Sequence, residues 1–426
     1  MQRIAFAGKS GDLCRKVESI GQKIAKKYKG LPLAAKTMGS LLRFKDTVQQ
    51  WQNVLDSEIW QLEEAAMELF PHLYLSYNEL SPELKRCFSY CAVFPKDHEI
   101  DVEELIRLWI AQGYVHPRRR GERLELVGLE YFNNLAMRSF FQEIQNVKYY
   151  YGFYGLTEYM QCKMHDIVHD FAQFLTKNEC HALDGTGRNS SSERPRHLTI
   201  LEEGTEEEMF SSRVVDFGRL RSFLTFHRFG RVVPQNLFCH LKCVRTLTLC
   251  HCGLAEIPAK IGGLIHLRHL DLSDNPFVAL PEAICDLYYL ETLDITFCDK
   301  LSSLPERIEG LVYLRHLFNE MTDELRQIPQ GLGKLTSLCT LSRFIARSNS
   351  DDLAILKDLN QLERLHIVTE REVDFGSAEF GKKINMQTGT WAAGTFAPMV
   401  RKLRGSVSLN TGTSRKLSHQ GESTIQ

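Results

Sequence analysis

Val244-Arg-Thr-Leu247-Thr-Leu249 is a short apolar stretch that returns three times along the chain. The later copies are Leu267-Arg-His-Leu270-Asp-Leu272, Leu290-Glu-Thr-Leu293-Asp-Ile295 and Leu314-Arg-His-Leu317. Their central leucines, Leu247, Leu270, Leu293 and Leu317, lie 23, 23 and 24 residues apart, which is the period of leucine-rich repeats. One such coil cannot bury its own apolar face, so the pattern predicts coils that stack into a curved solenoid.

The first three copies are each followed by a second feature of the same repeat. Cys252, Asn275 and Cys298 stand where a short side chain turns inward and bonds the backbone of a neighbouring turn. Less regular copies extend the array on both sides, at 198–200, 220–224, 338–341 and 362–367. We therefore expect about seven coils in a repeat domain over residues 195–370.

Length and composition restrict the class of protein. The chain of 426 residues has room for two or three domains, and its formal net charge of −1 argues against general polyanion binding. No apolar run is long enough to span a membrane, and the first ten residues lack the apolar core of a secretory signal. Twelve cysteines without paired spacing indicate reduced thiols, so we expect a protein of the cytoplasm or nucleus.

The part before the repeats is mainly helical. Apolar spacing predicts helices over 17–28, 33–42 and 49–62, which gives a helical domain over 1–66. Ser81 and Pro82 mark the start of a further helix, and others are predicted over 102–112, 128–141 and 164–175. The tyrosine-rich stretch 142–162 predicts a β-hairpin. Several helices with a small hairpin predict a winged-helix subdomain over 67–182.

Two segments carry no apolar period. Residues 183–194, rich in Gly and Ser, are expected to be a linker, and residues 371–426 are expected to be disordered. The predicted fold class is α+β multidomain: a helical domain, a winged helix, and then an α/β solenoid.

Two groups of cysteine and histidine residues resemble metal sites. One is Cys239-His240 with Cys243 and Cys250-His251-Cys252, where the repeat already explains Cys252. The other is Cys162, His165 and His169, which lacks a fourth ligand at a suitable spacing. We expect no metal at either place, and from residue type alone we expect His165 to cap a helix or make a buried polar contact.

The sequence contains no motif for catalysis. It has no G-x-S-x-G, no Rossmann fingerprint and no glycine-rich phosphate loop, since Gly8-Lys9-Ser10 has no glycine five residues before it. We therefore expect no catalytic residues and no enzyme activity.

Four motifs stand in a fixed order in front of the repeats. Gly30-Leu31-Pro32-Leu33-Ala34 is followed by the stretch 75–95, by Leu108-Trp109-Ile110-Ala111-Gln112-Gly113, and by Met164-His165-Asp166. Together with the repeats they resemble plant NB-ARC leucine-rich-repeat disease resistance proteins of the coiled-coil class. They match the GLPL motif, the opening of the winged-helix subdomain and the MHD motif of that family. The resemblance covers about residues 10–370.

The resemblance implies a switch that holds ADP at rest and exchanges it for ATP when the repeats sense a pathogen. It also implies that Pro32 packs near the adenine and that His165 approaches the β-phosphate. The family's phosphate loop, metal-binding aspartates and coiled coil lie upstream of GLPL and are not among these residues, which indicates an N-terminally truncated member. Because the phosphate cradle supplies most of the affinity for a nucleotide, we expect ADP binding to be weak or absent.

The outward-facing strand positions on the concave side of the solenoid are the predicted partner-binding face. They are Arg245, Thr246, Thr248, Arg268, His269, Asp271, Glu291, Thr292 and Asp294. Their mixed charge favours a protein, either a pathogen effector or a host protein. An alternative is that this face docks on the chain's own winged helix.

Other functions stay open. The winged helix is a candidate for DNA binding through the helix over 102–112, although Glu103 and Glu104 there oppose phosphate contact. A scaffold or decoy without a switch is a further alternative, and a nucleotide hydrolase is the least favoured.

Overall fold

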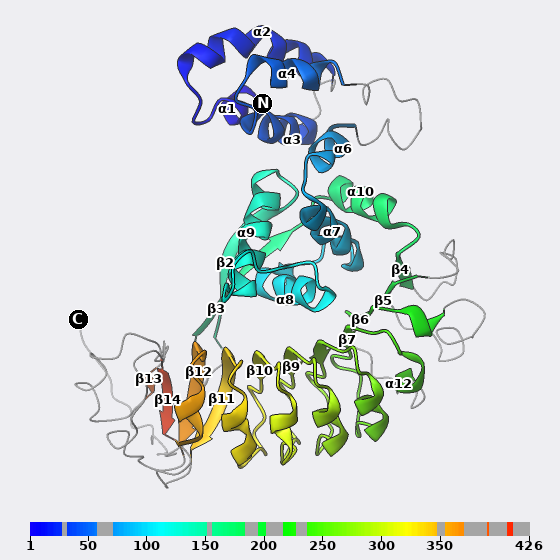
Figure 1. Cartoon of the computed structure of the whole chain (residues 1–426), viewed down its shortest axis with the longest axis vertical. Coiled ribbons are helices and arrows are strands. Elements are labelled where there is room, and N and C mark those ends of the chain that lie inside the picture. The colour runs from blue at the N-terminus through cyan, green and yellow to red at the C-terminus, as the bar shows by residue number, and fades with distance from the viewer. Residues whose placement is uncertain are drawn as a thin grey trace, which may run out of the picture.

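The buried residues of the chain form three separate hydrophobic cores, which follow one another along the sequence. The computed structural model describes residues 1–27, 32–57, 71–150, 156–183, 195–201, 216–226, 237–346, 354–369, 390–391 and 407–411. Within these residues a helical domain, a winged helix and a repeat solenoid follow one another, and the solenoid curves around the winged helix (Figure 1). The predicted fold class is confirmed.

The N-terminal domain is built from short helices around Trp51. Its helices are α1 (Gln2–Ala5), α2 (Gly11–Lys27), α3 (Pro32–Arg43) and α4 (Val48–Leu55). Helix α6 (Pro71–Asn78) joins it to the winged helix, because Leu75 lies in this core and Leu73 in the core of the winged helix. Trp51 and Met38 are fully buried in its core, and Thr47 with Gln50 forms a capping box at the start of α4. The helix predicted over 49–62 ends at Leu55 in the structure, and residues 58–70 lie outside the described part.

The winged helix joins helices and a small sheet. Its elements are α7 (Pro82–Tyr90), η2 (Cys91–Val93), β1 (Ile100–Asp101), α8 (Val102–Gln112), α9 (Leu124–Met137), β2 (Gln142–Tyr150), β3 (Leu156–Lys163) and α10 (Asp166–Thr176). As predicted, Ser81 caps α7, and β2 and β3 form an antiparallel hairpin, with β1 on the other side of β3. Asp101 fixes the start of α8, because its carboxylate accepts the backbone N–H groups of Glu103 at 2.7 Å and Glu104 at 3.0 Å.

Helix α9 corrects the prediction of a helix over 128–141. It begins four residues earlier, at Leu124, and places Gly128 inside the helix. A Cβ atom at Gly128 would lie 2.4 Å from Ile106 Cγ2, so the glycine lets α9 pack closely on α8. The helix ends at Met137 because Ser139 adopts a positive φ of 65°, which a right-handed helix cannot continue.

The solenoid is one long parallel sheet on the concave side, with 3-10 turns opposite. The strands are β5 (His197–Ile200), β6 (Ser222–Thr225), β7 (Thr246–Thr248), β8 (His269–Asp271), β9 (Thr292–Asp294), β10 (His316–Phe318), β11 (Thr340–Ala346) and β12 (Arg364–Thr369). The turns opposite them are η4 (Phe217–Arg219), α12 (Leu237–His240), η5 (Ala259–Gly263), η6 (Glu282–Asp286), η7 (Ile308–Gly310), η8 (Gln330–Lys334) and η9 (Ile355–Asp358). Leu247, Leu270, Leu293 and Leu317 stand in register, so the repeating leucines stack into one core.

Asn275 shows why a short polar residue is needed at the inward position of the repeat. Its side-chain oxygen accepts the backbone N–H groups of Cys252 at 3.1 Å and Leu254 at 2.9 Å, and its amide donates to the carbonyl of Leu272 at 2.8 Å. Cys298, one coil later, donates its thiol to the same carbonyl at 3.3 Å. These contacts satisfy backbone groups that turn away from the sheet.

Two predicted boundaries of the repeat domain are wrong. Strand β4 (Cys180–Leu183) pairs in parallel with β5, so the sheet begins inside the segment assigned to the winged helix. At the other end, β14 (Val407–Thr411) pairs with β12, and β13 (Thr390–Trp391) pairs with β14, within the segment 371–426 that was expected to be disordered. The other residues of that segment lie outside the described part. The linker was predicted over 183–194: Leu183 is the last residue of β4, and residues 184–194 fall outside the described residues. No helix of the described part is long and apolar enough to span a bilayer.

Candidate functional site

The concave strand face, predicted to bind a partner, lies against the winged helix of the same chain (Figure 1). Helix α8 packs on β7 and β8. Buried predicted residues are Thr246, Thr248, His269 and Thr292, and the half-buried ones are Arg245, Arg268, Asp271, Glu291 and Asp294. The alternative that this face docks on the chain's own winged helix is therefore what the structure shows. Binding of a separate partner stays a prediction and requires the two domains to part.

The end of α8 is bonded to the first regular coils. The side-chain amide of Gln112 donates to Ser222 Oγ at 3.0 Å and to Thr246 Oγ1 at 2.9 Å. In return, Arg245 Nη1 donates to the backbone carbonyl of Gln112 at 2.6 Å. The Tyr90 hydroxyl lies 3.0 Å from Ser222 Oγ. Because Gln112 is 1% exposed, these bonds form in a dry contact and hold the helix in one register.

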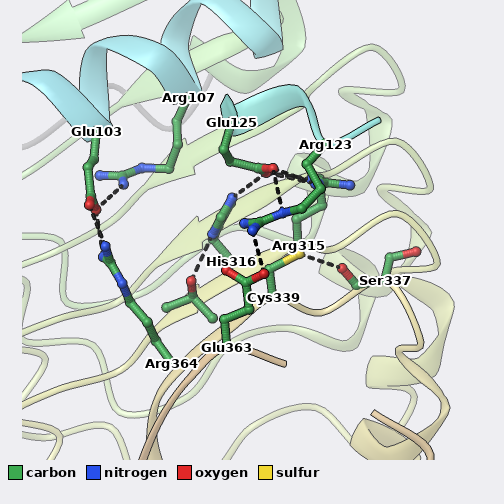
Figure 2. Close-up of polar contacts among 11 residues, drawn as sticks. Glu103, Arg107, Arg123, Glu125, Arg315, His316, Ser337, Cys339, Glu363 and Arg364 are labelled. Atoms are coloured by element: carbon green, nitrogen blue, oxygen red, sulfur yellow. Dashed lines mark hydrogen bonds and ion pairs between the residues drawn. The ribbon is translucent and has the colours of Figure 1, made fainter. Parts of the chain in front are cut away.

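Ion pairs join the start of α9 to the later coils, as Figure 2 shows. The Glu125 carboxylate accepts two hydrogen bonds from Arg315, both at 2.8 Å, and lies 3.2 Å from His316 Nε2. Arg123 lies 2.5 Å from the Glu363 carboxylate. Burial alone would raise the pKa of Glu125, but the His316 hydrogen bond and the Arg315 guanidinium outweigh it and hold that pKa well below its usual range.

The first turns of α8 make two further contacts with the repeats, an ion pair and a cation–π contact. Both nitrogens of the Arg364 fork donate to the carboxylate of Glu103, one of them at 2.6 Å (Figure 2). Arg107, one turn along the same helix, places its guanidinium 4.7 Å from the ring centre of Phe318. Acidic groups of the winged helix thus meet arginines of the repeats, while Arg123 meets an acid of the repeats.

A cavity of about 300 Å³ remains between the two domains. The winged helix supplies apolar walls such as Leu129 and Met160, and the repeats supply His316 and Thr340. Cys339 also lines it and is only 2% exposed. This thiol is therefore covered while the domains are docked, and its reactivity reports their separation.

The two residues that the resemblance assigns to a nucleotide lie on separate elements. Pro32 is exposed at the start of α3, and His165 is half-buried, where its Nδ1 accepts the backbone N–H of Ile167 at 3.3 Å and caps α10. The expectation of a helix cap at His165 is confirmed. A neutral ring with Nδ1 as acceptor carries its proton on Nε2, which can donate to an anion. No hydrogen bond or ion pair joins Pro32 to His165 among the described residues.

The phosphate side of such a pocket is not provided by Lys9. Its ammonium group donates to the carbonyl of Lys45 at 2.7 Å and to Asp46 at 2.9 Å, so it is already engaged. The residues described here offer one imidazole donor to a phosphate and no glycine-rich cradle, so they do not fit a complete nucleotide site. The roles of Pro32 and His165 stay predictions.

The metal-like groups have separate local roles. Cys252 is buried beside Asn275 in the repeat, and His169 Nε2 lies 2.8 Å from the carbonyl of Phe94. Cys162 is buried in the core of the winged helix. In the part of the chain that the structure describes, no group of three or more His, Cys, Asp or Glu residues is arranged to hold a metal.

Glu125, Arg315, His316 and Arg364 form the links between the domains, and none of them was predicted from the sequence. A signal was present, because Arg315-His316 occupies the same repeat position as the predicted Arg268-His269. Their partners are 190 or more residues away, which no local pattern indicates. Helix α8, the candidate for DNA binding, is the element that these repeats cover.

Comparisons with known proteins agree with this architecture. Residues 93–172 match the family described as disease resistance protein winged helix domain, and residues 219–384 match a leucine-rich repeat region. Disease resistance protein RGA2 of Solanum bulbocastanum is 35% identical over 405 residues, which is 94% of this chain and 38% of that protein. Disease resistance RPP13-like protein 4 of Arabidopsis thaliana is 29% identical over 400 residues, which is 90% of this chain and 45% of that protein.

The chain spans less than half of the length of each of these two relatives. Among solved structures, an internalin from Listeria monocytogenes is similar over 45% of this chain and 55% of its own, with a TM-score of 0.35 and 17% identity.

Proposed function

This chain belongs to the nucleotide-binding-site leucine-rich-repeat disease resistance proteins of plants, and we propose that its repeats hold the winged helix in a closed, resting arrangement. A partner protein that binds the concave face displaces the winged helix and starts the defence response. The observation that carries the proposal is the cover of that face by α8 and α9, through charged groups that complement one another.

The contacts favour a reversible closure over a permanent one. Arg315 with Glu125, Glu363 with Arg123 and Arg364 with Glu103 are charge pairs at the rim of an interface that retains a cavity. Interfaces between domains that are polar and incompletely packed are the ones that open in response to a ligand.

The partner and the winged helix compete for the same residues under this proposal. Arg268 and Glu291 pair with each other within the concave face, with 3.2 Å between their charged atoms, and stay half-buried in the closed state. We propose that the partner is a pathogen or host protein whose charges fit this mixed face.

The test is a defence response in leaf tissue that expresses the chain. Glu125→Arg places a cation against Arg315 and is expected to open the interface and change ion leakage from the tissue relative to the unaltered chain. The double variant Glu125→Arg with Arg315→Glu is expected to move the response back toward that of the unaltered chain. An unchanged response in the single variant, with the interface shown to be open, would argue against the proposed role of the closure.

Three further properties are part of the proposal. We propose that the chain is a binding and regulatory protein and not an enzyme, and that it acts in the cytoplasm or nucleus. We also propose that it binds ADP weakly or not at all. Of the groups that hold the phosphates in this family, the residues of this sequence include only His165.

A further inference from the structure

Three carboxylates meet where α8 crosses the centre of the concave face. Asp271 and Asp294 stand in register on β8 and β9, and neighbouring strands are only about 4.8 Å apart. Glu104 lies on α8, which packs on β8, and it interacts electrostatically with both aspartates. We call Glu104, Asp271 and Asp294 the acidic triad.

Few positive groups balance the acidic triad. Arg107 is the cation that acts on all three of its carboxylates, and its side chain is 14% exposed. The backbone N–H of Ser273 donates to Asp271 at 2.9 Å, and that of Thr296 donates to Asp294 at 2.9 Å. The other charged or titratable groups near the triad are Asp101, Cys250 and Glu320. One guanidinium cannot neutralise three carboxylates, and like charges opposite each other on a sheet are unfavourable.

We propose that docking of the winged helix on the repeats takes up protons at the acidic triad, so that the closed state is favoured near neutral pH and opens under alkaline conditions. This inference rests on the proposed closure and adds its regulation. The ligand of the triad is a proton that bridges neighbouring carboxylates, and the separated domains release it to water.

The closed state supports the sign of this effect. Burial and the charge of Asp101 raise the pKa of Glu104 to about 8, and burial with the charge of Asp294 raises the pKa of Asp271 to about 7. Burial likewise raises the pKa of Asp294. In the open state water solvates these groups, and their pKa values fall toward their ordinary values of about 4. Docking therefore binds protons, and the closed population falls as the pH rises through about 7 to 8.

Other groups of the interface act in different pH ranges. Burial lowers the pKa of His269 to about 3 and also lowers that of His316, so acidification below their ordinary pKa of about 6.5 favours the open state. Glu125 has a lowered pKa and stays ionised in both states near neutrality. Burial also raises the pKa of Glu291 and of Glu320 to about 7, so these two carboxyl groups add to the proton uptake of the acidic triad. Closure is therefore strongest near neutrality.

Alkylation of Cys339 in the intact chain, read by mass spectrometry, tests the proposal. The ratio of its rate in Glu104→Gln to its rate in the unaltered chain is measured at pH 7.0 and at pH 8.5, so that the ionisation of the thiol cancels. A neutral side chain at 104 needs no proton, so the variant should be relatively better protected at the higher pH. The ratio is expected to be about tenfold lower at pH 8.5 than at pH 7.0. The reason is that Glu104, with a pKa of about 8 in the closed state, loses most of its proton over this range in the unaltered chain.

Matched variants separate this inference from the proposed closure. Asp294→Asn should shift the ratio in the same direction, while Glu103→Gln, one residue from Glu104, should raise alkylation by the same factor at both pH values. A ratio for Glu104→Gln and Asp294→Asn that does not change with pH refutes the proton uptake. If Glu125→Ala also leaves Cys339 protected, the closure itself is wrong.

Discussion

Glu125→Ala should open the contact between the winged helix and the repeats about 30-fold. The carboxylate accepts two hydrogen bonds from Arg315, and both side chains are 18% exposed. Two hydrogen bonds to a charged group contribute about 3 kcal/mol together. Partial exposure and the nearby Glu291, which also attracts Arg315, reduce this to about 2 kcal/mol. At 25 °C that free energy corresponds to a change of about 30-fold in the ratio of closed to open molecules.

The assay is the alkylation rate of Cys339 at pH 7.0. Its thiol lines the cavity between the domains, so an open interface exposes it, whereas Cys298 is buried inside a coil and serves as an internal control. Glu130→Ala is the matched control variant. Glu130 pairs with Arg118 within the winged helix, and both are more than half exposed, so its loss should leave Cys339 unaffected.

A charge exchange makes the test specific for the pair. Glu125→Arg with Arg315→Glu should recover part of the protection that Glu125→Arg loses, and the recovery is partial because position 315 lies near Glu291. Equal alkylation of Cys339 in the unaltered chain, in Glu125→Ala and in Glu125→Arg would refute the reasoning, since the pair would then contribute nothing to docking.

Three further predictions concern packing, the repeat and the nucleotide. Gly128→Ala should lower the free energy of unfolding by about 2 kcal/mol in chemical denaturation, because its Cβ would meet Ile106 at 2.4 Å, while Gly263→Ala, with no atom within 4 Å, should be nearly neutral. Asn275→Ala should cost about 3 kcal/mol in the same assay, because buried backbone groups lose their partners, and a loss below about 0.5 kcal/mol would contradict the bonding described. Calorimetry with ADP should give no detectable heat, whereas tight binding that His165→Ala abolishes would show that a nucleotide pocket forms.

The repeats were predictable because their pattern is local. Leu247, Leu270 and Leu293 recur at nearly constant intervals, and each strand needs only its neighbours to bury its face. The hairpin β2–β3 and the cap at Ser81 also follow from adjacent residues. The start of α9 was predicted four residues late, at Gly128, and the reason for a glycine inside this helix is its close contact with Ile106, which no local pattern indicates.

The contacts of the candidate site depend on distant residues and could be predicted only in part. The concave face and its residues, such as His269 and Asp271, follow from the repeat, and the sequence left open whether they contact the winged helix. The pairing of Glu103 with Arg364 joins residues 261 positions apart. Such a pair depends on the angle at which two domains meet, and that angle is set by the whole of both surfaces.

Solution X-ray scattering on the intact chain at pH 7.0 tests the closed arrangement most directly, by comparison with the double variant Glu103→Arg with Glu125→Arg. Both substitutions place arginine against an arginine of the repeats and leave the cores of the two domains untouched. The closed arrangement predicts a smaller maximum dimension and radius of gyration for the unaltered chain than for the double variant. Identical scattering from the two proteins, with both fully folded by circular dichroism, would contradict docking of the winged helix on the repeats.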